Sequence, residues 1–512
     1  MNLRDLVIRR AETSPQALAV KSPDASLTYG ELDSMANRFA HALAQLGTQH
    51  GDRVGIWLDK SPYTVAAMQG VLRLGAIYVP LDPLSPASRI CTIIRDCDIR
   101  TLITTQRRAE AVLASDLPQI ACLSLDRTGP GMTWEDLMEF PDSPVAETGS
   151  DENEVAYILY TSGSTGKPKG VCISHRNALA FIEWALHTLE ATPSDRFANH
   201  APFHFDLSVL DLYVAFAAGA AVFLIPDAVA SIPQYLVNCI TQEQLTVWYS
   251  VPSVLILMME HGGLLELEPA SLPLRAILFA GEPFPIKHLR RLYQYRSKHV
   301  RLLNLYGPTE TNVCTFYEVT HLPEDQVRPV PIGKSCSGDD VWARKEDGTV
   351  ARPGETGELM VEGPTVMVGY WGQPKQGNKP YATGDLVQLQ EDGNYTYLGR
   401  RDHMMKVRGY RIEPGEVEAA LEQHPAISEA AVITVGKGME SRLAAFVVAS
   451  TADPPHLLEI KRHCAERLPR YMIVDDVYFV SELPRTRNGK IDRLSLANSL
   501  ASEDRRIQHA AK

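Results

Sequence analysis

Residues 160–170 read YTSGSTGKPKG, and they follow directly on the apolar run VAYIL at 155–159. A strand that ends in such a loop offers backbone N–H groups, hydroxyl groups and ammonium charge to a single polyanion. That polyanion is most simply a nucleoside triphosphate. A flexible surface loop would explain the glycines and serines, but not the two lysines on either side of Pro168. The sequence therefore predicts a strand followed by a phosphate-binding loop.

Two better-known phosphate-binding patterns do not fit this loop. The Walker A pattern requires a glycine where Thr161 stands, and it requires Ser or Thr where Pro168 follows Lys167. The dinucleotide-binding pattern G-x-G-x-x-G also fails, because two residues rather than one separate Gly163 and Gly166. The loop therefore predicts a phosphate site of another kind.

The 512-residue chain is too long for one ordinary domain, and we expect two or more. Its hydrophobic content of 45% and charged content of 22% are typical of a globular protein. The formal net charge of −12 disfavours nucleic acid as a partner, because phosphate backbones are bound by clustered Lys and Arg. An anionic substrate must then be held by local groups.

Neither a membrane segment nor a secretion signal is expected. No apolar run approaches the roughly twenty residues that span a bilayer, and the first residues, MNLRDLVIRRAETSP, have no uninterrupted apolar core. The eight cysteines are scattered, and the closest pair, Cys91 and Cys97, forms no C-x-x-C motif. We therefore expect a cytoplasmic protein without a membrane partner, a disulfide framework or structural zinc.

Short apolar strands alternate with helical stretches in most of the chain. Strand-like runs occur at 53–58, 275–280 and 301–305, and a helical stretch occurs at 66–74. Strands separated by helices argue for an α/β layered body.

The pattern of apolar and turn-forming residues changes near residue 329. Between 329 and 400 the sequence contains short β-like runs at 357–361, 366–370 and 395–398, punctuated by Gly and Pro. This pattern predicts a small barrel or sandwich subdomain.

The last hundred residues resemble a separate module. A helical segment at 415–423 and strand-like segments at 430–435 and 443–448 predict a compact α+β domain. The polar residues 502–512 are expected to form a disordered tail.

Several further motifs follow the loop in a fixed order, and two more precede it. They are NLYGPTE at 304–310, YATGD at 381–385, GRRD at 399–402, KVRG at 406–409 and NGK at 488–490, with LTYGEL at 27–32 and LRLGAIYVP at 72–80. Together they resemble the adenylate-forming superfamily of acyl-CoA ligases, luciferases and amino-acid-activating domains of nonribosomal peptide synthetases. The two early motifs are most similar to the peptide-synthetase branch.

The resemblance implies a fold and a domain division. It implies a large N-terminal body of αβ layers with a small β-barrel over residues 1–401, and a smaller mobile α+β lid over 402–501. Asp402 falls where the family has its hinge.

The resemblance also implies a two-step reaction. A carboxylate is joined to the α-phosphate of ATP with release of pyrophosphate, and a thiol then attacks the mixed anhydride. Both steps develop negative charge, which hydrogen-bond donors, cationic side chains and Mg²⁺ must stabilise.

Site residues carry over from the family motif by motif. The residues implied for ATP binding are Thr161, Ser162, Gly163, Thr165, Lys169, Asn304, Tyr306, Gly307, Thr309, Asp385, Tyr397 and Arg400. Glu310 is implied as the Mg²⁺ ligand, and Lys490, Lys406 and Asp402 as catalytic or hinge residues. Arg401 and Arg408 are instead interpreted as a solvated basic face.

Lys490 is the strongest catalytic candidate. Most lysines are solvated surface charge, but the Asn488-Gly489 turn would present this side chain at a loop tip. By resemblance, its ammonium group bridges the substrate carboxylate and the α-phosphate during adenylation. A catalytically inactive binding module would be expected to lack Lys490, Glu310 or Asp385, and all three are present.

Asp206 decides the substrate class. It lies in HFDLSVL at 204–210, where amino-acid-activating domains have a carboxylate that binds the α-ammonium group. A helix N-cap would explain the same residue. The other specificity positions are Leu207, Leu210, Tyr249, Leu278, Ala280, Leu305, Val313 and Cys314. None of these eight is charged, so the substrate side chain should be small to medium and apolar.

This pocket resembles that of free-standing enzymes that activate L-proline. The stretch FDLSVLDLY at 205–213 also resembles D-alanine ligases, and an acyl-CoA ligase is a third reading. No Gly-Gly-x-Ser attachment site for phosphopantetheine occurs in the sequence. We therefore expect transfer in trans to a small acidic carrier protein, with ATP and Mg²⁺ as cofactors.

Overall fold

The computed structural model describes residues 1–146, 149, 151–163, 166–401, 404–436, 440–450, 454–485 and 491–500. The chain divides into two compact units. The first comprises Met1–Pro83, Cys91–Tyr160 and Gly170–Arg401. The second comprises Leu84–Ile90, Thr161–Lys169 and the described part of Asp402–Lys512.

A nine-stranded sheet in the first unit has the order β15-β14-β13-β12-β11-β9-β10-β1-β2. The strands from β13 to β1 run parallel, and β14, β15 and β2 add antiparallel edges. Their bounds are β1 (Leu18–Lys21), β2 (Ser26–Thr28), β9 (Arg196–Asn199), β10 (Ala221–Leu224), β11 (Val247–Ser250), β12 (Ala276–Phe279), β13 (Arg301–Tyr306), β14 (Thr315–Glu318) and β15 (Lys334–Ser335). Ligand sites of such sheets lie outside the carboxyl ends of the parallel strands.

A second sheet of the first unit has seven strands in the order β18-β8-β7-β4-β3-β5-β6. The bounds are β3 (Arg53–Ile56), β4 (Ile77–Pro80), β5 (Thr101–Thr104), β6 (Ala121–Ser124), β7 (Val155–Thr161), β8 (Lys169–Ser174) and β18 (Gly369–Tyr370). Side chains from both sheets meet in one buried cluster, which includes Tyr78, Tyr157, Phe197 and Leu303. One core therefore holds the two sheets together.

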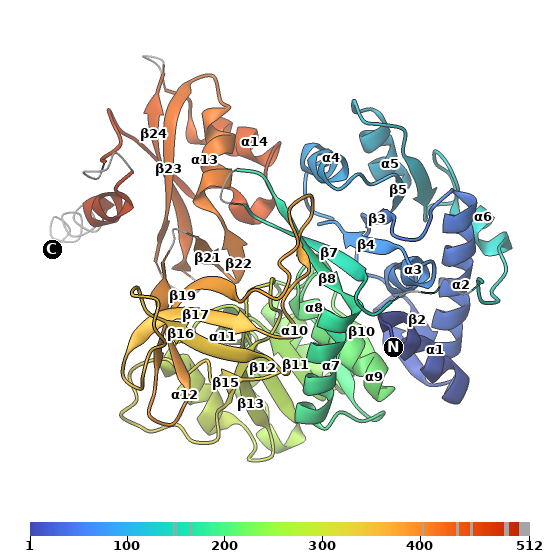
Figure 1. Ribbon diagram of the computed structural model, residues 1–512, viewed down its shortest axis with the longest axis horizontal. Helices are drawn as coiled ribbons and strands as arrows, with labels where there is room; N and C mark the ends of the chain where they lie inside the picture. Colours follow the sequence, from blue (N-terminus) through green and yellow to red (C-terminus); the bar gives the residue numbers. More distant parts are fainter. Residues whose placement is uncertain are drawn as a thin grey trace. The chain divides into compact units, whose positions relative to one another are not determined.

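Helices cover these sheets (Figure 1). They are α1 (Leu3–Thr13), α2 (Tyr29–Gln45), α3 (Pro62–Arg73), α4 (Ala87–Asp96), α5 (Gln106–Leu113), α6 (Trp134–Glu139), α7 (His175–Leu189), α8 (Leu207–Val209), π-helix η1 (Leu210–Val214), α9 (Ala215–Ala218), α10 (Pro233–Gln242), α11 (Pro252–His261), short 3₁₀ turns η2 (Leu264–Glu266) and η3 (Pro269–Ser271), and α12 (Ile286–Tyr295). Capping boxes begin α2 at Thr28 and α7 at Ser174, which fixes where these helices start.

The β-rich region is a four-stranded antiparallel sheet in the order β16-β17-β19-β20. Its strands are β16 (Asp340–Arg344), β17 (Thr356–Glu362), β19 (Tyr381–Leu389) and β20 (Tyr395–Arg400). One expected strand of this region was wrong. Only Gly369–Tyr370 of residues 366–370 is a strand, and it pairs with β8 of the seven-stranded sheet. Its hydrogen-bond partners lie almost two hundred residues away, and a local pattern cannot specify them.

The second unit contains its own α+β core. Strands β23 (Ile427–Val435), β24 (Arg442–Ala449) and β25 (Asp476–Phe479) form a sheet. The hairpin β21 (Met405–Val407) and β22 (Tyr410–Ile412), the helices α13 (Pro414–Glu422) and α14 (Leu457–Ala465), and the 3₁₀ turn η5 (Arg470–Met472) complete it. Apolar side chains of α13, α14 and β23 meet in one cluster, as expected for a separate module.

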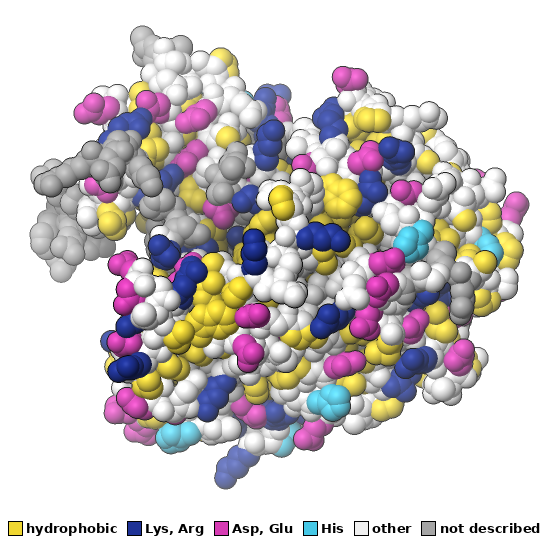
Figure 2. Space-filling model, viewed as in Figure 1, with side chains coloured by type: hydrophobic (Ala, Val, Ile, Leu, Met, Phe, Trp, Pro, Cys, Tyr) yellow, Lys and Arg dark blue, Asp and Glu magenta, His cyan; other side chains and the backbone are white. Residues whose placement is uncertain are grey.

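The surface carries charges of both signs. On the face shown in Figure 2, Lys and Arg side chains are interspersed with Asp and Glu side chains. Throughout the described ranges, every helix is too short or too polar to cross a bilayer.

Candidate active site

The phosphate loop connects β7 to β8 and folds back tightly on itself. A Cβ atom on Gly163 would lie 1.9 Å from the carbonyl oxygen of Lys167, so the close approach requires glycine here. The buried Ser162 hydroxyl donates to the Arg411 carbonyl at 2.9 Å and accepts the Glu413 N–H at 3.2 Å. This loop therefore has the compact backbone that an anion cradle needs.

A carboxylate already contacts the loop backbone. The Gly163 N–H donates to Glu416 at 3.4 Å, and Glu416 is also paired with Arg89. The loop N–H group is thus directed at an acceptor with negative charge, which is the chemistry expected for phosphate. Thr165, one of the predicted phosphate ligands, lies outside the described residues, and Lys169 begins β8.

Four of the predicted ATP-binding residues, Asp385 included, come together. The Tyr306 hydroxyl donates to the carboxylate of Asp385, and Arg400 donates to its other oxygen at 2.8 Å. The rings of Tyr306 and Tyr397 lie 6.5 Å apart. Burial raises the pKa of Tyr306 well above its usual value, so this hydroxyl stays a neutral donor. A carboxylate has about four lone-pair sites, which leaves Asp385 able to accept further hydroxyl groups.

The other predicted nucleotide residues surround the end of β13. The Asn304 side chain donates to the Pro331 carbonyl at 2.8 Å. A Cβ atom on Gly307 would lie 1.5 Å from the Asn312 carbonyl oxygen, so the chain after β13 can turn only with glycine at this position. Thr309 follows in the same turn and accepts the Asn312 N–H at 3.5 Å.

Glu310 is fully buried and is held by a tyrosine. The Tyr370 hydroxyl donates to its Oε1 at 2.7 Å and lies 3.5 Å from the Tyr381 hydroxyl. Tyr370 could not be identified from the sequence, because no local pattern connects it to residue 310. A group of three or more His, Cys, Asp or Glu side chains able to hold a metal does not occur in the part of the chain that the structure describes. Mg²⁺ is usually bound through one or two carboxylates together with substrate phosphates and waters, which Glu310 fits.

Asp206 lies at the start of the short helix α8, but its side chain makes no capping hydrogen bond. Asp206 therefore occupies the N-cap position of α8 without a capping hydrogen bond from its side chain. Its carboxylate lies close enough to two buried tyrosines to affect them. Burial is the main cause that raises the pKa values of Tyr157 and Tyr249. The charge of Asp206 is among the further causes that raise both.

The apolar specificity residues lie in the core beside the carboxyl ends of neighbouring strands. Tyr249 of β11 pairs in register with Leu278 of β12, and β13, which carries Leu305, is the next strand along. Seven of the set are buried: Leu210, Tyr249, Leu278, Ala280, Leu305, Val313 and Cys314. Leu207 is partly buried and packs against the same core as most of them.

A cluster of buried tyrosines in the same core was not found from the sequence. The Tyr213 hydroxyl donates to the Tyr78 hydroxyl at 3.1 Å, and the ring of Tyr78 stacks on that of Tyr157 at 5.3 Å. These side chains come from three separate elements, η1, β4 and β7. Single tyrosines in apolar runs predict only core packing, so no sequence signal distinguishes them.

Two of the three catalytic or hinge candidates, Asp402 and Lys490, lie outside the described residues. Lys406 is in β21, just before the turn of the β21–β22 hairpin. Arg408 and Gly409 form this turn with φ values of 51° and 84°, as type I′ turns require. Arg401 and Arg408 are exposed, as expected, and each also pairs with a carboxylate: Arg401 with Glu358 at 3.0 Å and Arg408 with Asp475 at 3.5 Å.

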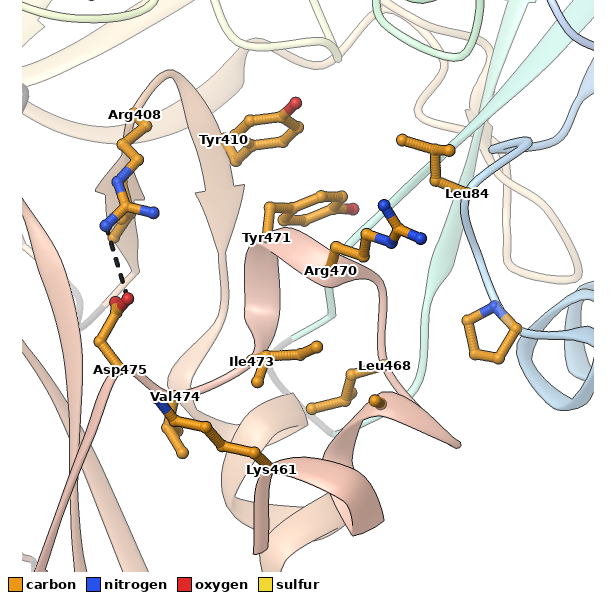
Figure 3. Close-up of a pocket in the computed structure, with 13 residues that line it drawn as sticks. Leu84, Arg408, Tyr410, Lys461, Leu468, Arg470, Tyr471, Ile473, Val474 and Asp475 are labelled. Atoms are coloured by element: carbon orange, nitrogen blue, oxygen red, sulfur yellow. Dashed lines mark ion pairs between the residues drawn. The ribbon is translucent and has the colours of Figure 1, made fainter. Parts of the chain in front are cut away.

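The second unit also has a cavity of about 620 Å³ beside this hairpin (Figure 3). The rings of Tyr410 and Tyr471 stack there at 4.2 Å. Arg408, Lys461 and Arg470 bring positive charge to its lining, and Asp475, which pairs with Arg408, brings one negative charge. The lysine and arginine side chains of this lining can bind an anionic group.

Comparisons with known proteins agree with this architecture. Residues 7–371 match the family described as AMP-binding enzyme, and residues 416–490 match the AMP-binding enzyme C-terminal domain. The solved structure of the Vibrio cholerae adenylation domain AlmE, in complex with glycyl-adenosine-5'-phosphate, is 25% identical with a TM-score of 0.83. That similarity covers 98% of each chain.

Two curated relatives are similar over almost their full length. An L-proline--[L-prolyl-carrier protein] ligase of Pseudomonas fluorescens is 50% identical over 95% of this chain and 97% of the relative. A ligase with the same name from Streptomyces coelicolor is 41% identical over 91% of each chain. Because the family match covers most of the sequence and these relatives align from end to end, the chain belongs to the AMP-binding enzyme family, whose members form adenylates from ATP.

Proposed function

We propose that this protein activates L-proline with ATP to form prolyl-AMP and pyrophosphate. It then transfers the prolyl group to the phosphopantetheine thiol of a separate carrier protein. What supports the proposal most is the 50% identity with a proline ligase over nearly the whole of both chains. The predicted specificity residues other than Asp206 are uncharged and seven of them are buried, which supports the same substrate class.

In the first step, a proline carboxylate oxygen attacks the α-phosphorus of ATP and pyrophosphate leaves. Asp385 would accept the ribose hydroxyls, with Tyr306 and Arg400 holding its carboxylate in place. The loop backbone at Gly163 and the ammonium of Lys169 would bind the phosphates. Glu310 would hold Mg²⁺, which supplies charge neutralisation on the phosphate oxygens. The ammonium group of Lys490 would donate hydrogen bonds to the proline carboxylate and to the α-phosphate.

In the second step, the carrier thiolate attacks the carbonyl carbon of prolyl-AMP, and AMP leaves. By resemblance, the second unit rotates about Asp402 between the two steps. That rotation would withdraw Lys490 and bring the hairpin segment with Lys406 to the site.

Proline fits the chemistry of the proposed pocket. Its secondary ammonium has two N–H groups that one carboxylate can accept, so Asp206 would bind it through a charge-assisted pair. The ring carbons would contact the apolar side chains of β11, β12 and β13. A substrate with a polar side chain would lose its hydrogen-bond partners on entering this pocket.

The test is pyrophosphate exchange measured with a panel of acids. We expect exchange with L-proline well above that with D-alanine, L-alanine, L-valine or octanoate. Ring analogues that differ by one methylene should be discriminated only about 10- to 200-fold, because such a group is worth roughly 1–3 kcal/mol. A preference for D-alanine would identify a D-alanine ligase instead, and a preference for octanoate would overturn the role of Asp206.

The carrier step gives a separate prediction about the cavity of the second unit. An acidic carrier protein with its phosphate-linked arm should be attracted by Lys461 and Arg470 (Figure 3). Reversing both charges, with Lys461→Glu and Arg470→Glu, should slow thioester formation by about tenfold at low salt, because charges at an interface mainly set the association rate. Pyrophosphate exchange should not change.

Arg462 provides the matched control for this test. It lies next to Lys461 on α14, is 85% exposed and does not line the cavity. Arg462→Glu should leave thioester formation within about twofold of the unmodified protein. An equal loss in both variants would mean that general surface charge, rather than the cavity, attracts the carrier.

A further inference from the structure

Lys60 is a buried cation that the proposed reaction does not use. Its side chain is 1% exposed, in the segment between β3 and α3. Its Nζ donates to the carbonyl oxygens of Asn199 at 3.3 Å and His200 at 2.7 Å. It also lies 3.7 Å from the carboxylate of Asp227. Lys60 therefore connects the end of β3 in one sheet to the ends of β9 and β10 in the other.

The carbonyls that Lys60 binds begin the segment that carries Asp206. This segment leaves β9 at Asn199 and enters α8 after Asp206. Its far end is tied back to its start, because the Asn199 side chain donates to Asp211 of η1 at 3.1 Å. Asp206 thus lies on a short loop whose two ends are both held by hydrogen bonds of the network of Lys60, Asn199 and Asp211.

A buried charge of this kind needs an explanation beyond stability. Taking an ammonium and a carboxylate out of water costs several kcal/mol per ion, and apolar replacements of such pairs are often neutral or stabilising. Burial lowers the pKa of Lys60 to about 8, with the nearby Asp227 limiting the decrease. Burial raises the pKa of Asp211 well above its usual value, while the hydrogen bond from Asn199 and the charge of Lys60 act to lower it. In the geometry, Lys60 and Asp227 form the ion pair of this network.

We propose that Lys60 is a positioning residue for the substrate's ammonium group, because it fixes the loop that holds Asp206. The inference rests on the proposed function, in which Asp206 binds the ammonium of proline. Lys60 itself does not touch the substrate. Its contacts are with Asn199, His200 and Asp227, which lie on other elements than the nucleotide residues of β13 and β19, so its loss should displace the amino-acid site selectively.

The experiment compares Lys60→Met with Arg73→Met by pyrophosphate exchange. Lys60→Met keeps the apolar stem and removes the charge. Displacing Asp206 by even about 1 Å should raise the KM for L-proline on the order of 10- to 100-fold. The KM for ATP should stay within about twofold. The preference for L-proline over cyclopentanecarboxylate, which has no nitrogen, should fall by a similar factor.

Arg73 is the matched control because it is a buried cation at the other end of α3. It is 4% exposed and pairs with Asp33 at 2.6 Å. Arg73→Met should lower the melting temperature about as much as Lys60→Met does, but it should leave the KM for L-proline unchanged. If both variants raise this KM equally, or if both KM values of Lys60→Met rise together, Lys60 is only a structural residue.

A double variant covers the case in which Lys60→Met does not fold. In Lys60→Met/Asp227→Asn the buried anion is removed together with its partner, so no charge is left unpaired. This variant should fold and should show the same selective rise in the KM for L-proline. Aggregation of both Lys60 variants while Arg73→Met folds would overturn the proposal. An unmodified protein without proline-dependent exchange would instead refute the proposed function.

Discussion

Lys490→Ala is expected to lower proline-dependent pyrophosphate exchange on the order of 10²–10³-fold, which is the usual effect of removing one donor from a developing oxyanion. The same variant should still transfer the prolyl group from synthetic prolyl-AMP to the carrier at nearly the normal rate. The reason is the proposed rotation of the second unit, which would withdraw Lys490 before the thiol attacks. Both half-reactions are measured separately on one preparation of the variant.

Asp402→Pro tests the same rotation of the second unit through its effect on thioester formation. Proline fixes φ near −65° and should hinder rotation at this residue, so exchange should be spared while thioester formation slows. Lys406 in the β21–β22 hairpin would then be kept from the site during the second step. An equal loss of both half-reactions in Lys490→Ala would refute the alternation, and an equal loss in Asp402→Pro would exclude Asp402 as its hinge.

The α/β body could be predicted because its signals are local. The apolar run before the phosphate loop is β7, and the run expected at 301–305 is β13 (Arg301–Tyr306). The order of the strands was not predictable, because β9 and β12 both pair with β11 although long helices separate them. The two-residue strand β18 shows the same limit, since its partner β8 is far away in the sequence.

The residues of the candidate site also differ in whether a local sequence pattern identifies them. Tyr306, Asp385 and Arg400 could be named because each lies in a recognisable motif, and the structure brings these three together. Lys60 could not be named, because a lone lysine in a polar segment is usually solvated. Only the tertiary structure places its ammonium beside the end of β9 and the partly buried carboxylate of Asp227. Motifs therefore identify groups that touch a ligand better than groups that hold those residues in position.

Asp206→Ala is expected to cause the second large loss of activity, and this loss should affect the recognition of L-proline and not that of ATP. Leaving the ammonium of bound proline without its carboxylate should cost about 3–5 kcal/mol, or roughly 150- to 5,000-fold in kcat/KM for L-proline. The KM for ATP should change little, because the nucleotide residues lie on other elements. The variant should also stop discriminating L-proline from cyclopentanecarboxylate, since the lost contact is the one that distinguishes them.

Asp206→Ser separates charge from helix capping. Serine is as good an N-cap as aspartate, so a purely structural role would leave Asp206→Ser fully active. Because the Asp206 side chain makes no capping hydrogen bond, we expect both variants to melt within a few degrees of the unmodified protein. Asp206→Ser should nevertheless lose proline exchange almost as completely as Asp206→Ala, because a hydroxyl cannot replace a carboxylate facing a desolvated ammonium. Retention of normal proline kinetics in Asp206→Ser would require another residue to bind the ammonium group.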